Sequence, residues 1–511
     1  MSAKQQMLLS IDVGTTHCKA ALFSEQGELL RISKMKTTSY IKDGWTYYNP
    51  EQLWTGIAGL IRDIVVPAAE EAAVSVAAIG IASMAETGVL VDPVTGEARS
   101  PFIPWFSRCS LSQADQIAAE GNVLERFRAT GLHAGFKFGM AKLLWLRQQG
   151  PSALDGAVWL SASDYIAYKL SGAMATDYTL AARTFAFRID KKEWDSDWIR
   201  HFGFHPSLFP EAVPSGTIIG SVHSEAGSLL GLRAGIPVVI AGHDHVAASL
   251  AVGVVKPGQV MDSMGTAETL VGVLAERRLT EEDFGSGLSF GCHPVAGHSF
   301  WMGGLSASGG SVEWFRSVLS EPELSYERIL RLLSEHAEAN EAGSPTGILY
   351  FPYLSGSGAP EPDARARAAF IGMTAEHGLT DLLTAVLEGT AYEMEWIRRT
   401  GEHATNAAIK ELILTGGGTH NPAWLQIKAN ASGCLLRNAE LPEAALLGAA
   451  LLAGVGAGVY ENAEQAAGTV AASRRGRIVY PQGAAHDKYK VLFEEGYVPL
   501  QQPLRNYYRM L

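Results

Sequence analysis

The chain opens with an alternation of short apolar and polar stretches that predicts three successive strands. Residues 8–11 are an apolar run that ends at Asp12, and residues 13–17 form a polar turn with the sequence Val-Gly-Thr-Thr-His. Residues 20–23 and 29–32 are two further β-prone runs, separated by a glycine-containing reversal. The first predicted strand therefore delivers a carboxylate into a glycine turn.

Further along the chain, stretches with helical spacing of apolar residues alternate with short β-prone runs. Ser163 and Asp164 are the candidate N-caps of one such helix. Residues 190–214 are rich in Trp, Phe, His and Pro and predict an irregular insertion, and the tail from residue 463 is expected to be helical and then irregular. The main predicted helices are 53–64, 138–147, 163–170, 246–254, 380–398 and 442–452, and the predicted strands are 76–81, 236–241 and 411–415.

The opening pattern recurs near the middle of the chain. A β-prone run at residues 259–264 enters a Gly265-Thr266 turn and leaves through residues 270–273. Gly14 and Gly265 lie 251 positions apart, about half of the 511 residues, and a chain of this length is too long for one hydrophobic core. The repeat therefore predicts a duplicated α/β domain.

Composition narrows the class of protein. Hydrophobic residues make up 47% and charged residues 18%, which is typical of a soluble globular chain. The net charge is −12 and no dense Lys/Arg run occurs, so no nucleic-acid partner is expected. The four cysteines are widely spaced, which favours a reducing cytoplasm over a disulfide framework. Residues 446–460 are short for a membrane span and predict a buried helix, and Asp12 interrupts the first apolar run, so neither a membrane anchor nor a signal peptide is expected.

Three glycine turns each follow a predicted strand, at Gly14, at Gly265 and at residues 416–418. Glycine lets the backbone approach a phosphate closely, and a following helix N-terminus adds free N–H donors. One such turn is as well explained by an ordinary hairpin, and no Walker loop occurs. Three turns, two of them related by the repeat, favour nucleotide binding.

Asp244 is the candidate catalytic base, because it ends a predicted buried strand immediately before a helix. In open α/β sheets the carboxyl ends of the strands line the ligand crevice, where a carboxylate can take a proton from a hydroxyl. The structural alternative is an N-cap. The flanking His243 and His245 raise a metal alternative, which is disfavoured because ligands so close on a turn rarely converge without a third partner.

Glu86 and Trp105 follow strand ends in the first half of the chain. A carboxylate and an aromatic ring there would hydrogen-bond to and stack on a polyhydroxy substrate. The alternative for Trp105 is simple packing beneath a loop.

Twelve motifs in order resemble the FGGY carbohydrate kinases, which include the glycerol, xylulose, ribulose and gluconate kinases. The resemblance implies two ribonuclease-H-like domains with the actin-like ATPase fold and ATP in the cleft between them. It places the sugar-binding domain at residues 1–250, the nucleotide-binding domain at 251–460 and an extension at 461–511. The motifs include IDVGTTHCKAALF, GWTYYNPEQLW, KLLWLR, SASDYIAYKLSG, AGHDHVAASLAVG, GTAETL, SASGGSVEWFR, AVLEGTAYEMEW, TGGGTHNPAWLQIKANASG and PEAALLGAALLAG.

Carried over residue by residue, the resemblance assigns Asp244 as the base that activates the sugar hydroxyl and Asp12 as a ligand of Mg²⁺ through water. The remaining assignments are Glu86, Ala85, Trp105 and His245 to the substrate, Gly14, Thr15, Thr16 and Lys19 to the phosphates, Gly265 and Thr266 to the transferred phosphoryl group, and Gly309, Gly417, Gly418 and Asn421 to the nucleotide.

The substrate segment Met84-Ala85-Glu86-Thr87 matches no subgroup cleanly. At these four positions the segment typical of xylulose kinases is Gln-Met-His-Gly, and that typical of glycerol kinases is Gln-Arg-Glu-Thr. We expect an ATP-dependent kinase of a small sugar, with a ketopentose such as D-xylulose preferred and ribulose, glycerol or gluconate as alternatives. The family suggests a homodimer. An actin-fold chaperone or scaffold ATPase, and a kinase-derived sugar sensor, are the rival functions.

Overall fold

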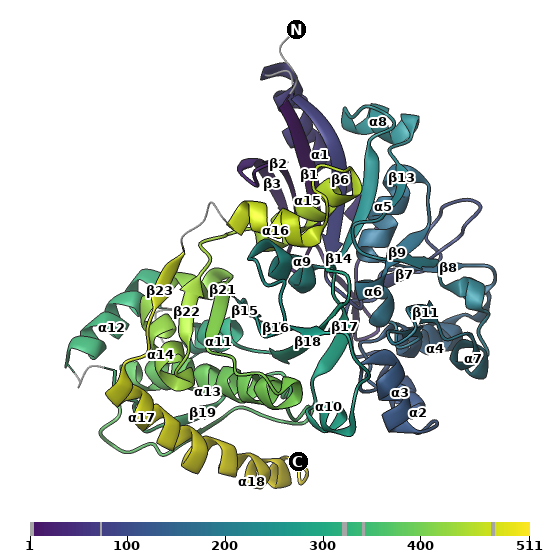
Figure 1. Ribbon diagram of the computed structural model, residues 1–511. Helices are drawn as coiled ribbons and strands as arrows, with labels where there is room; N and C mark the ends of the chain where they lie inside the picture. Colours follow the sequence, from purple (N-terminus) through teal and green to yellow (C-terminus); the bar gives the residue numbers. More distant parts are fainter. Residues whose placement is uncertain (1–4, 72–73, 319–323, 340–342, 472–475) are drawn as a thin grey trace.

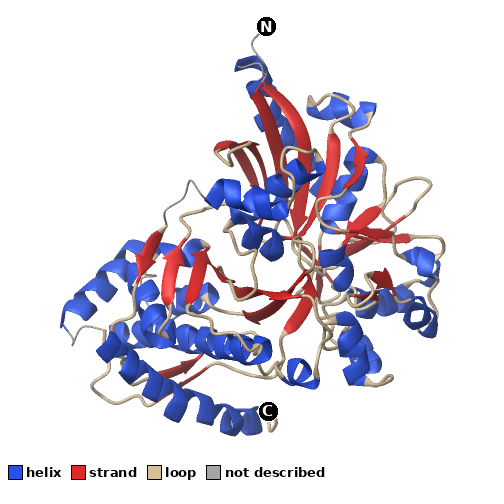
Figure 2. Ribbon diagram, viewed as in Figure 1, coloured by secondary structure: helices blue, strands red, loops and turns tan. Residues whose placement is uncertain are grey.

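The computed structural model describes the whole chain except residues 1–4, 72–73, 319–323, 340–342 and 472–475. Two lobes, each built on a mixed β-sheet with helices against its faces, make up the molecule (Figures 1 and 2). The N-terminal sheet lies in the upper lobe of the view, and the sheet that begins at β15 lies in the lower one (Figure 1).

The first sheet has the order β13-β14-β6-β1-β2-β3. Strands β1, β6 and β14 are parallel, whereas β1–β2, β2–β3 and β13–β14 are antiparallel. The strands span Gln5–Val13 (β1), His17–Ser24 (β2), Leu29–Lys36 (β3), Val74–Ser83 (β6), Ile218–Ser221 (β13) and Pro237–His243 (β14).

The second sheet has the order β17-β18-β16-β15-β21-β22-β23, with β15, β21 and β22 parallel and β15–β16 antiparallel. Apart from the additional β17, it repeats the first sheet strand for strand. This confirms the predicted duplication. The strands span Val260–Met264 (β15), Glu268–Ala275 (β16), Ser289–Cys292 (β17), His298–Leu305 (β18), Glu411–Thr415 (β21), Leu435–Asn438 (β22) and Arg477–Val479 (β23).

Two small-residue helices, α9 (Asp244–Ala251) and α15 (Ala444–Gly456), lie between the two sheets (Figure 1). One buried cluster joins them to both sheets, with Leu8 and Phe23 from the first and Met261 and Phe300 from the second. Helix α15 thus packs on the first sheet although it comes late in the chain. The beginnings of both helices reach the strand ends where candidate site residues lie.

The outer faces of the sheets are covered by the remaining long helices. Helix α1 (Pro50–Glu71) and helix α5 (Ala162–Ser171) contribute to the core of the first lobe, and α13 (Leu379–Thr405) and α14 (Pro422–Ser432) to that of the second. The other elements are β4 (Tyr40–Lys42), β5 (Trp45–Tyr47), β7 (Gly88–Val91), α2 (Leu111–Ala118), α3 (Val123–Thr130), α4 (Gly139–Gln149), β8 (Val158–Ser161), β9 (Ala175–Asp177), α6 (Tyr178–Ala182), β10 (Phe187–Arg188), β11 (Glu193–Trp194), α7 (Ser196–His201), β12 (Glu211–Val213), α8 (Ser224–Leu230), α10 (Glu281–Gly285), α11 (Gly309–Val318), α12 (Tyr326–Ala339), β19 (Leu349–Phe351), β20 (Ala369–Ile371), α16 (Ala463–Ala471), α17 (Gly483–Val491) and α18 (Val498–Tyr508).

Two local predictions are wrong. The tail ends in helices α17 and α18 rather than irregularly, because Tyr489 and Tyr497 are buried in the second core and donate hydrogen bonds to Glu388 and Glu393 on α13. Helix α5 is capped by Ser161, not by Ser163 or Asp164. Asp164 closes that capping box from the third helical position.

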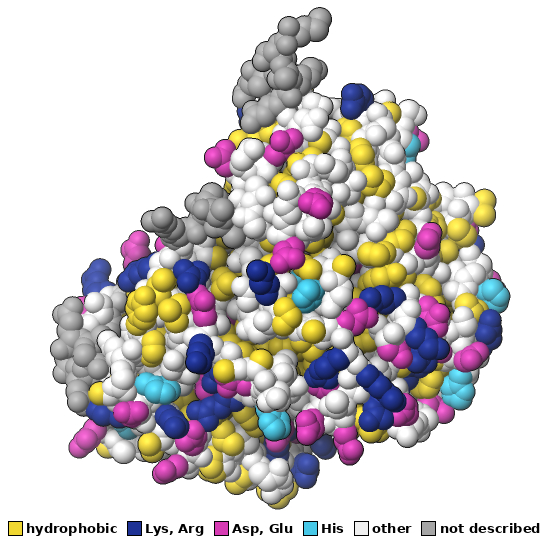
Figure 3. Space-filling model, in the orientation of Figure 1, with side chains coloured by type: hydrophobic (Ala, Val, Ile, Leu, Met, Phe, Trp, Pro, Cys, Tyr) yellow, Lys and Arg dark blue, Asp and Glu magenta, His cyan; other side chains and the backbone are white. Residues whose placement is uncertain are grey.

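Side chains of both charges are mixed on the face shown in Figure 3, mostly over its lower half, and yellow apolar side chains lie between them. This face therefore carries no continuous basic surface among its described residues. In the described parts of the chain, every helix is too short or too polar to cross a lipid bilayer.

Candidate active site between the strand ends

The parallel strands of the first sheet bring three candidate residues to the same end of the sheet. Asp12 in β1 is paired with Ala82 in β6, which is also the partner of Gly242 in β14. Glu86 follows β6 and Asp244 follows β14 directly. The carboxyl ends of parallel strands thus place Asp12, Glu86 and Asp244 at the same end of the sheet, as the sequence predicts.

Asp12 is a buried carboxylate in a negative environment. Burial and the nearby carboxylates of Asp244 and Glu443 raise its pKa to about 8, although Lys19 acts in the opposite direction. Its Oδ1 atom is buried and has no hydrogen-bond partner in the described part of the chain. Carboxylate oxygens are the ligands that Mg²⁺ prefers, so these groups fit a divalent cation.

Asp244 is the first residue of α9, and His243 occupies the N-cap position. The backbone N–H of His245 donates to Asp244 Oδ1 at 2.7 Å, and His243 Nε2 lies 3.3 Å from the same oxygen. Burial and the neighbouring Glu86 raise the pKa of Asp244 to about 7. Asp244 is therefore not the helix cap, and its pKa lies where a base for reactions near neutral pH is most effective.

The two flanking histidines come closer to Asp244 than the sequence suggested. One possible ligand atom of each of the three residues lies within 4.8 Å of the others. Burial lowers the pKa of His243 well below its usual value and that of His245 to about 4, so both rings are neutral at pH 7. The histidines frame the carboxylate without adding positive charge.

Glu86 is held by cations that sequence reasoning did not identify. Arg183, which follows α6, donates from Nε at 2.9 Å and from Nη2 at 2.6 Å to Glu86 Oε1, and Lys137 Nζ lies 3.9 Å from that oxygen. Burial alone would raise the pKa of Glu86, but Arg183 and Lys137 together lower it to about 2. Glu86 therefore stays ionised and accepts hydrogen bonds throughout the physiological range.

The first glycine turn is joined to the substrate loop through Trp105. Its indole Nε1 donates to Thr15 Oγ1 at 2.9 Å, and its backbone N–H donates to Thr87 Oγ1 at 3.2 Å. Trp105 is half-buried rather than fully packed beneath the loop. Thr16, in contrast, is exposed. The turn and the substrate loop thus form one surface.

Two further predicted residues have structural partners. Lys19 donates to Glu443 at the start of α15 at 2.6 Å, which ties β2 to that helix. Ala85 is buried in the core of the first lobe, so its side chain faces away from solvent.

The glycines assigned to the nucleotide meet at the corresponding end of the second sheet. The N–H of Gly309, at the start of α11, donates to the carbonyl of Gly265 at 3.1 Å, and a Cβ on Gly309 would lie 2.6 Å from that oxygen. Gly416 adopts φ +93° against the Met264 backbone, a conformation that side chains disfavour. Gly418 packs on the Met264 side chain, whereas Gly417 is open and exposed. Thr266 accepts backbone hydrogen bonds from Ser308 and Gly310.

A buried ion network stiffens this second turn. Lys428 on α14 contacts Asp262 at 3.3 Å and also Glu268, so it bridges the two strands on either side of Gly265. Ser308 donates to Glu268 at 2.6 Å. Asn421 caps α14 by accepting the N–H of Trp424, which is the structural use of that residue type. One buried lysine thus faces two buried carboxylates, and burial and Glu268 raise the pKa of Asp262 to about 7.

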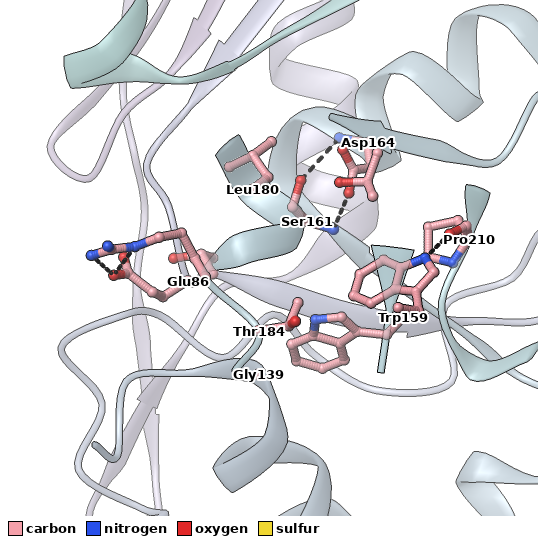
Figure 4. Close-up of a pocket in the computed structure, with 12 residues that line it drawn as sticks. Glu86, Gly139, Trp159, Ser161, Asp164, Leu180, Thr184 and Pro210 are labelled. Carbon is pink, nitrogen blue, oxygen red and sulfur yellow. Dashed lines mark hydrogen bonds and ion pairs between the residues drawn. The ribbon is translucent and has the colours of Figure 1, made fainter. Parts of the chain in front are cut away.

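Behind Glu86 lies a small cavity of about 20 Å³, large enough for about one water molecule. Figure 4 shows Glu86 on one side of it and Ser161 and Asp164 on the other, with Trp159 below. Oδ1 of Asp164 and Nη1 of Arg183 are buried without partners in the described chain.

The residues missed from the sequence are Arg183, Lys137 and Glu443. Each lies far along the chain from its partner, and none follows a strand at a glycine turn. Lys142 is the first residue of the KLLWLR motif. A lysine within an apolar helix could have indicated a site residue, because burial of an ammonium group costs free energy unless the group is paired.

Comparison with known proteins places this site in a family. The family model for the N-terminal domain of the FGGY family of carbohydrate kinases matches residues 7–251, and that for the C-terminal domain matches residues 261–457. The chain belongs to the FGGY family of carbohydrate kinases. This kinase is 27% identical over 500 residues to the xylulose kinase of Bacillus subtilis, covering 95% of each chain. It is 28% identical over 472 residues to the glycerol kinase of Janthinobacterium sp. (strain Marseille), covering 90% of this chain and 92% of that one.

The fold of this FGGY kinase is that of a crystallised member. The Plasmodium falciparum glycerol kinase solved with ADP superposes with a TM-score of 0.86 at 21% identity, covering 98% of this chain and 99% of the other. This confirms the predicted α/β architecture of two actin-like ATPase lobes. The names of these relatives give different substrates, so the comparisons do not identify the sugar.

Proposed function

We propose that this FGGY kinase transfers the γ-phosphate of Mg-ATP to a hydroxyl of a small sugar, and that the sugar is a ketopentose such as D-xylulose. The observation that carries the proposal is Asp244. Its pKa is raised to about 7, and it lies with Asp12 and the ionised Glu86 at the carboxyl ends of the parallel strands. The converging turns at Gly265, Gly309 and residues 416–418 supply the nucleotide site.

In this proposal Asp244 accepts the proton of the sugar hydroxyl, whose oxygen attacks the γ-phosphorus while the bond to the β,γ-bridging oxygen breaks and ADP leaves. Glu86 and Trp105 orient the sugar. Asp12 holds Mg²⁺, which neutralises charge on the phosphates when it is bound. Most of the rate enhancement comes from positioning, as is usual for phosphoryl transfer.

Lys137 favours a second candidate, an aldonate such as gluconate. Two cations, Arg183 and Lys137, face the single carboxylate of Glu86, and the Lys137 side chain is 42% exposed. Arg183 is buried and binds Glu86 through Nε and Nη2, so the exposed Lys137 is the cation that can meet a substrate carboxylate.

The experiment is ADP release, by a coupled assay, over a panel of ketoses, polyols and aldonates. The proposal predicts the highest kcat/KM with a ketopentose and little effect of Lys137→Met on it. The aldonate alternative predicts the highest value with gluconate, and a loss of about 10-fold or more in Lys137→Met, since charged hydrogen bonds contribute about 1.5–3 kcal/mol. Lys191→Met, at an exposed lysine, is the matched control.

The cysteines support the expected reducing compartment. Cys18, Cys109, Cys292 and Cys434 are all free, and Cys18, Cys292 and Cys434 are buried. We propose a cytoplasmic location on this basis.

A further inference from the structure

Lys142 is a charged residue in an unusual place. It lies in the second turn of α4, with its side chain fully buried among apolar neighbours such as Met140, Leu143 and Leu144. Burial lowers the pKa of its ammonium to about 7. Within the described chain it makes no ion pair. A lysine in such a position destabilises the fold unless its ammonium is hydrogen-bonded.

The hydrogen bonds of Lys142 go to two backbone carbonyls. Nζ donates to the carbonyl of Glu86 and, at 3.1 Å, to the carbonyl of Ile103. Glu86 lies in the loop between β6 and β7, and Ile103 lies two residues before Trp105. One ammonium thus joins the two loops that carry the substrate-binding groups of the proposed function.

The backbone of Glu86 needs such support. Its φ angle is +58°, in the left-handed region that a residue with a side chain rarely adopts. Strained backbone of this kind persists at functional sites only where its surroundings hold it. The carboxylate of Glu86 is bound by Arg183 and its carbonyl by Lys142, so both ends of the residue are fixed.

The second loop is joined to the first at three places. The carbonyl of Ile103 shares the Lys142 ammonium with the carbonyl of Glu86, and the N–H of Trp105 donates to the Thr87 hydroxyl. The N–H of Ile103 also donates to the carbonyl of Gly88 at 3.0 Å. The distance between the Glu86 carboxylate and the Trp105 ring therefore depends on all three connections, and only the one through Lys142 holds Glu86 itself.

We propose that Lys142 is a positioning residue for the sugar site: its ammonium fixes the separation of Glu86 and Trp105 and holds Glu86 in its left-handed conformation. The proposal rests on the proposed function for its kinetic consequence, but not for its structural one. Without the ammonium, the two carbonyls lose their shared donor and Glu86 relaxes to a commoner conformation that no longer presents its carboxylate to the sugar.

The test compares Lys142→Met, which keeps the length and the apolar stem, with Lys142→Gln, which keeps an N–H donor. Lys191→Met, at an exposed lysine, is the control. We expect Lys142→Met to lower kcat/KM for the sugar by about 10- to 100-fold, because small misplacements of substrate-positioning groups have effects of that size. The KM for ATP stays unchanged, and Lys142→Gln recovers part of the loss.

Two kinetic results would overturn the proposal. One is an unchanged kcat/KM for the sugar in Lys142→Met. The other is an equal loss of sugar and ATP binding with no recovery in Lys142→Gln, which is what general destabilisation produces. If Lys142→Met does not fold, Lys142→Gln alone is compared with the wild-type protein, and an unchanged kcat/KM for the sugar in that variant counts against the proposal.

A crystal structure of Lys142→Met provides a readout that needs no activity. The proposal predicts a negative φ at Glu86 and loss of its bond to Arg183, and an unaltered Glu86 contradicts it. If the wild-type protein phosphorylates no sugar, the proposed function is refuted. The structural prediction for Glu86 is then still tested by the crystal structure alone.

Discussion

The two hairpins that open the lobes have the same topology but differ in how their buried carboxylates are paired. Around Gly14 the strand ends carry carboxylates that repel one another, and burial and this repulsion raise the pKa of Asp12 to about 8. Around Gly265 the buried Asp262 and Glu268 share the ammonium of Lys428. In the first hairpin Oδ1 of Asp12 has no partner among the described residues, whereas in the second both carboxylates contact a buried lysine.

This contrast teaches how one duplicated fold divides a reaction. A site that must move a proton and attract a cation needs carboxylates whose charge the protein has not itself neutralised. A site that must receive a polyphosphate needs close backbone approach and free N–H donors. The following predictions test that division, beginning with the largest effect.

Asp244→Asn removes the proposed base and keeps its shape. We expect kcat to fall by about 10²–10⁴-fold, the usual contribution of general-base catalysis, with nucleotide affinity retained. Steady-state kinetics with the preferred sugar measures the loss. Asp197→Asn, at a fully exposed carboxylate on α7, is the matched control and should behave as wild type.

Gly309→Ala tests the backbone role of the second hairpin. A Cβ at this position would lie 2.6 Å from the carbonyl of Gly265, so the two turns must separate. At an overpacking cost of about 1–3 kcal/mol, the KM for ATP should rise by about 5- to 100-fold while the KM for the sugar changes little. Gly468→Ala has open space around it and should leave both constants unchanged. A selective loss of sugar binding in Gly309→Ala would reverse the assignment of the lobes.

The pH profile tests whether the carboxylate of Asp244, beside the first hairpin, acts as the base. Asp244 must be ionised to accept a proton, and its pKa is raised to about 7. The value of kcat/KM for the sugar should therefore be highest above pH 8 and fall about tenfold per pH unit well below pH 7. Because Asp12 and Asp244 interact, the midpoint belongs to the pair. A flat profile between pH 5 and 8 would argue against Asp244 as the base.

Ser308→Ala removes one hydrogen bond from the buried network around Lys428, the one that Ser308 donates to Glu268. Loss of a buried hydrogen bond to a charged group should lower the free energy of unfolding by about 1–3 kcal/mol. The KM for ATP should rise only a few-fold. Urea unfolding of this variant, beside Ser317→Ala at an exposed site, measures the difference.

The sequence predicted those parts of the site that follow a strand directly. Asp12, Gly14, Asp244 and Gly265 each end or follow a strand whose apolar pattern is clear, and a strand end fixes the position of the next residue. The helical end of the tail escaped prediction, because α17 and α18 are held by tyrosines that reach α13 rather than by an obvious amphipathic pattern.

Arg183, Lys137 and Lys142 escaped assignment to the site for a different reason. They reach Glu86 from α6, the loop before α4 and α4 itself, and their roles depend on tertiary contacts across long sequence separations. The motif containing Lys142 was visible, but the target of its ammonium was not. Sequence patterns locate strand ends, whereas the residues that support them emerge only from packing.

The most direct test of the central claim is a phosphate balance with γ-labelled ATP, the preferred sugar of the panel, and the wild-type and Asp244→Asn proteins. The claim predicts that the wild-type protein places nearly all of the label on the sugar, with little released as inorganic phosphate, and that Asp244→Asn loses this transfer. ATP turnover that is independent of every sugar and increases with unfolded peptides, as in a chaperone ATPase, would contradict it.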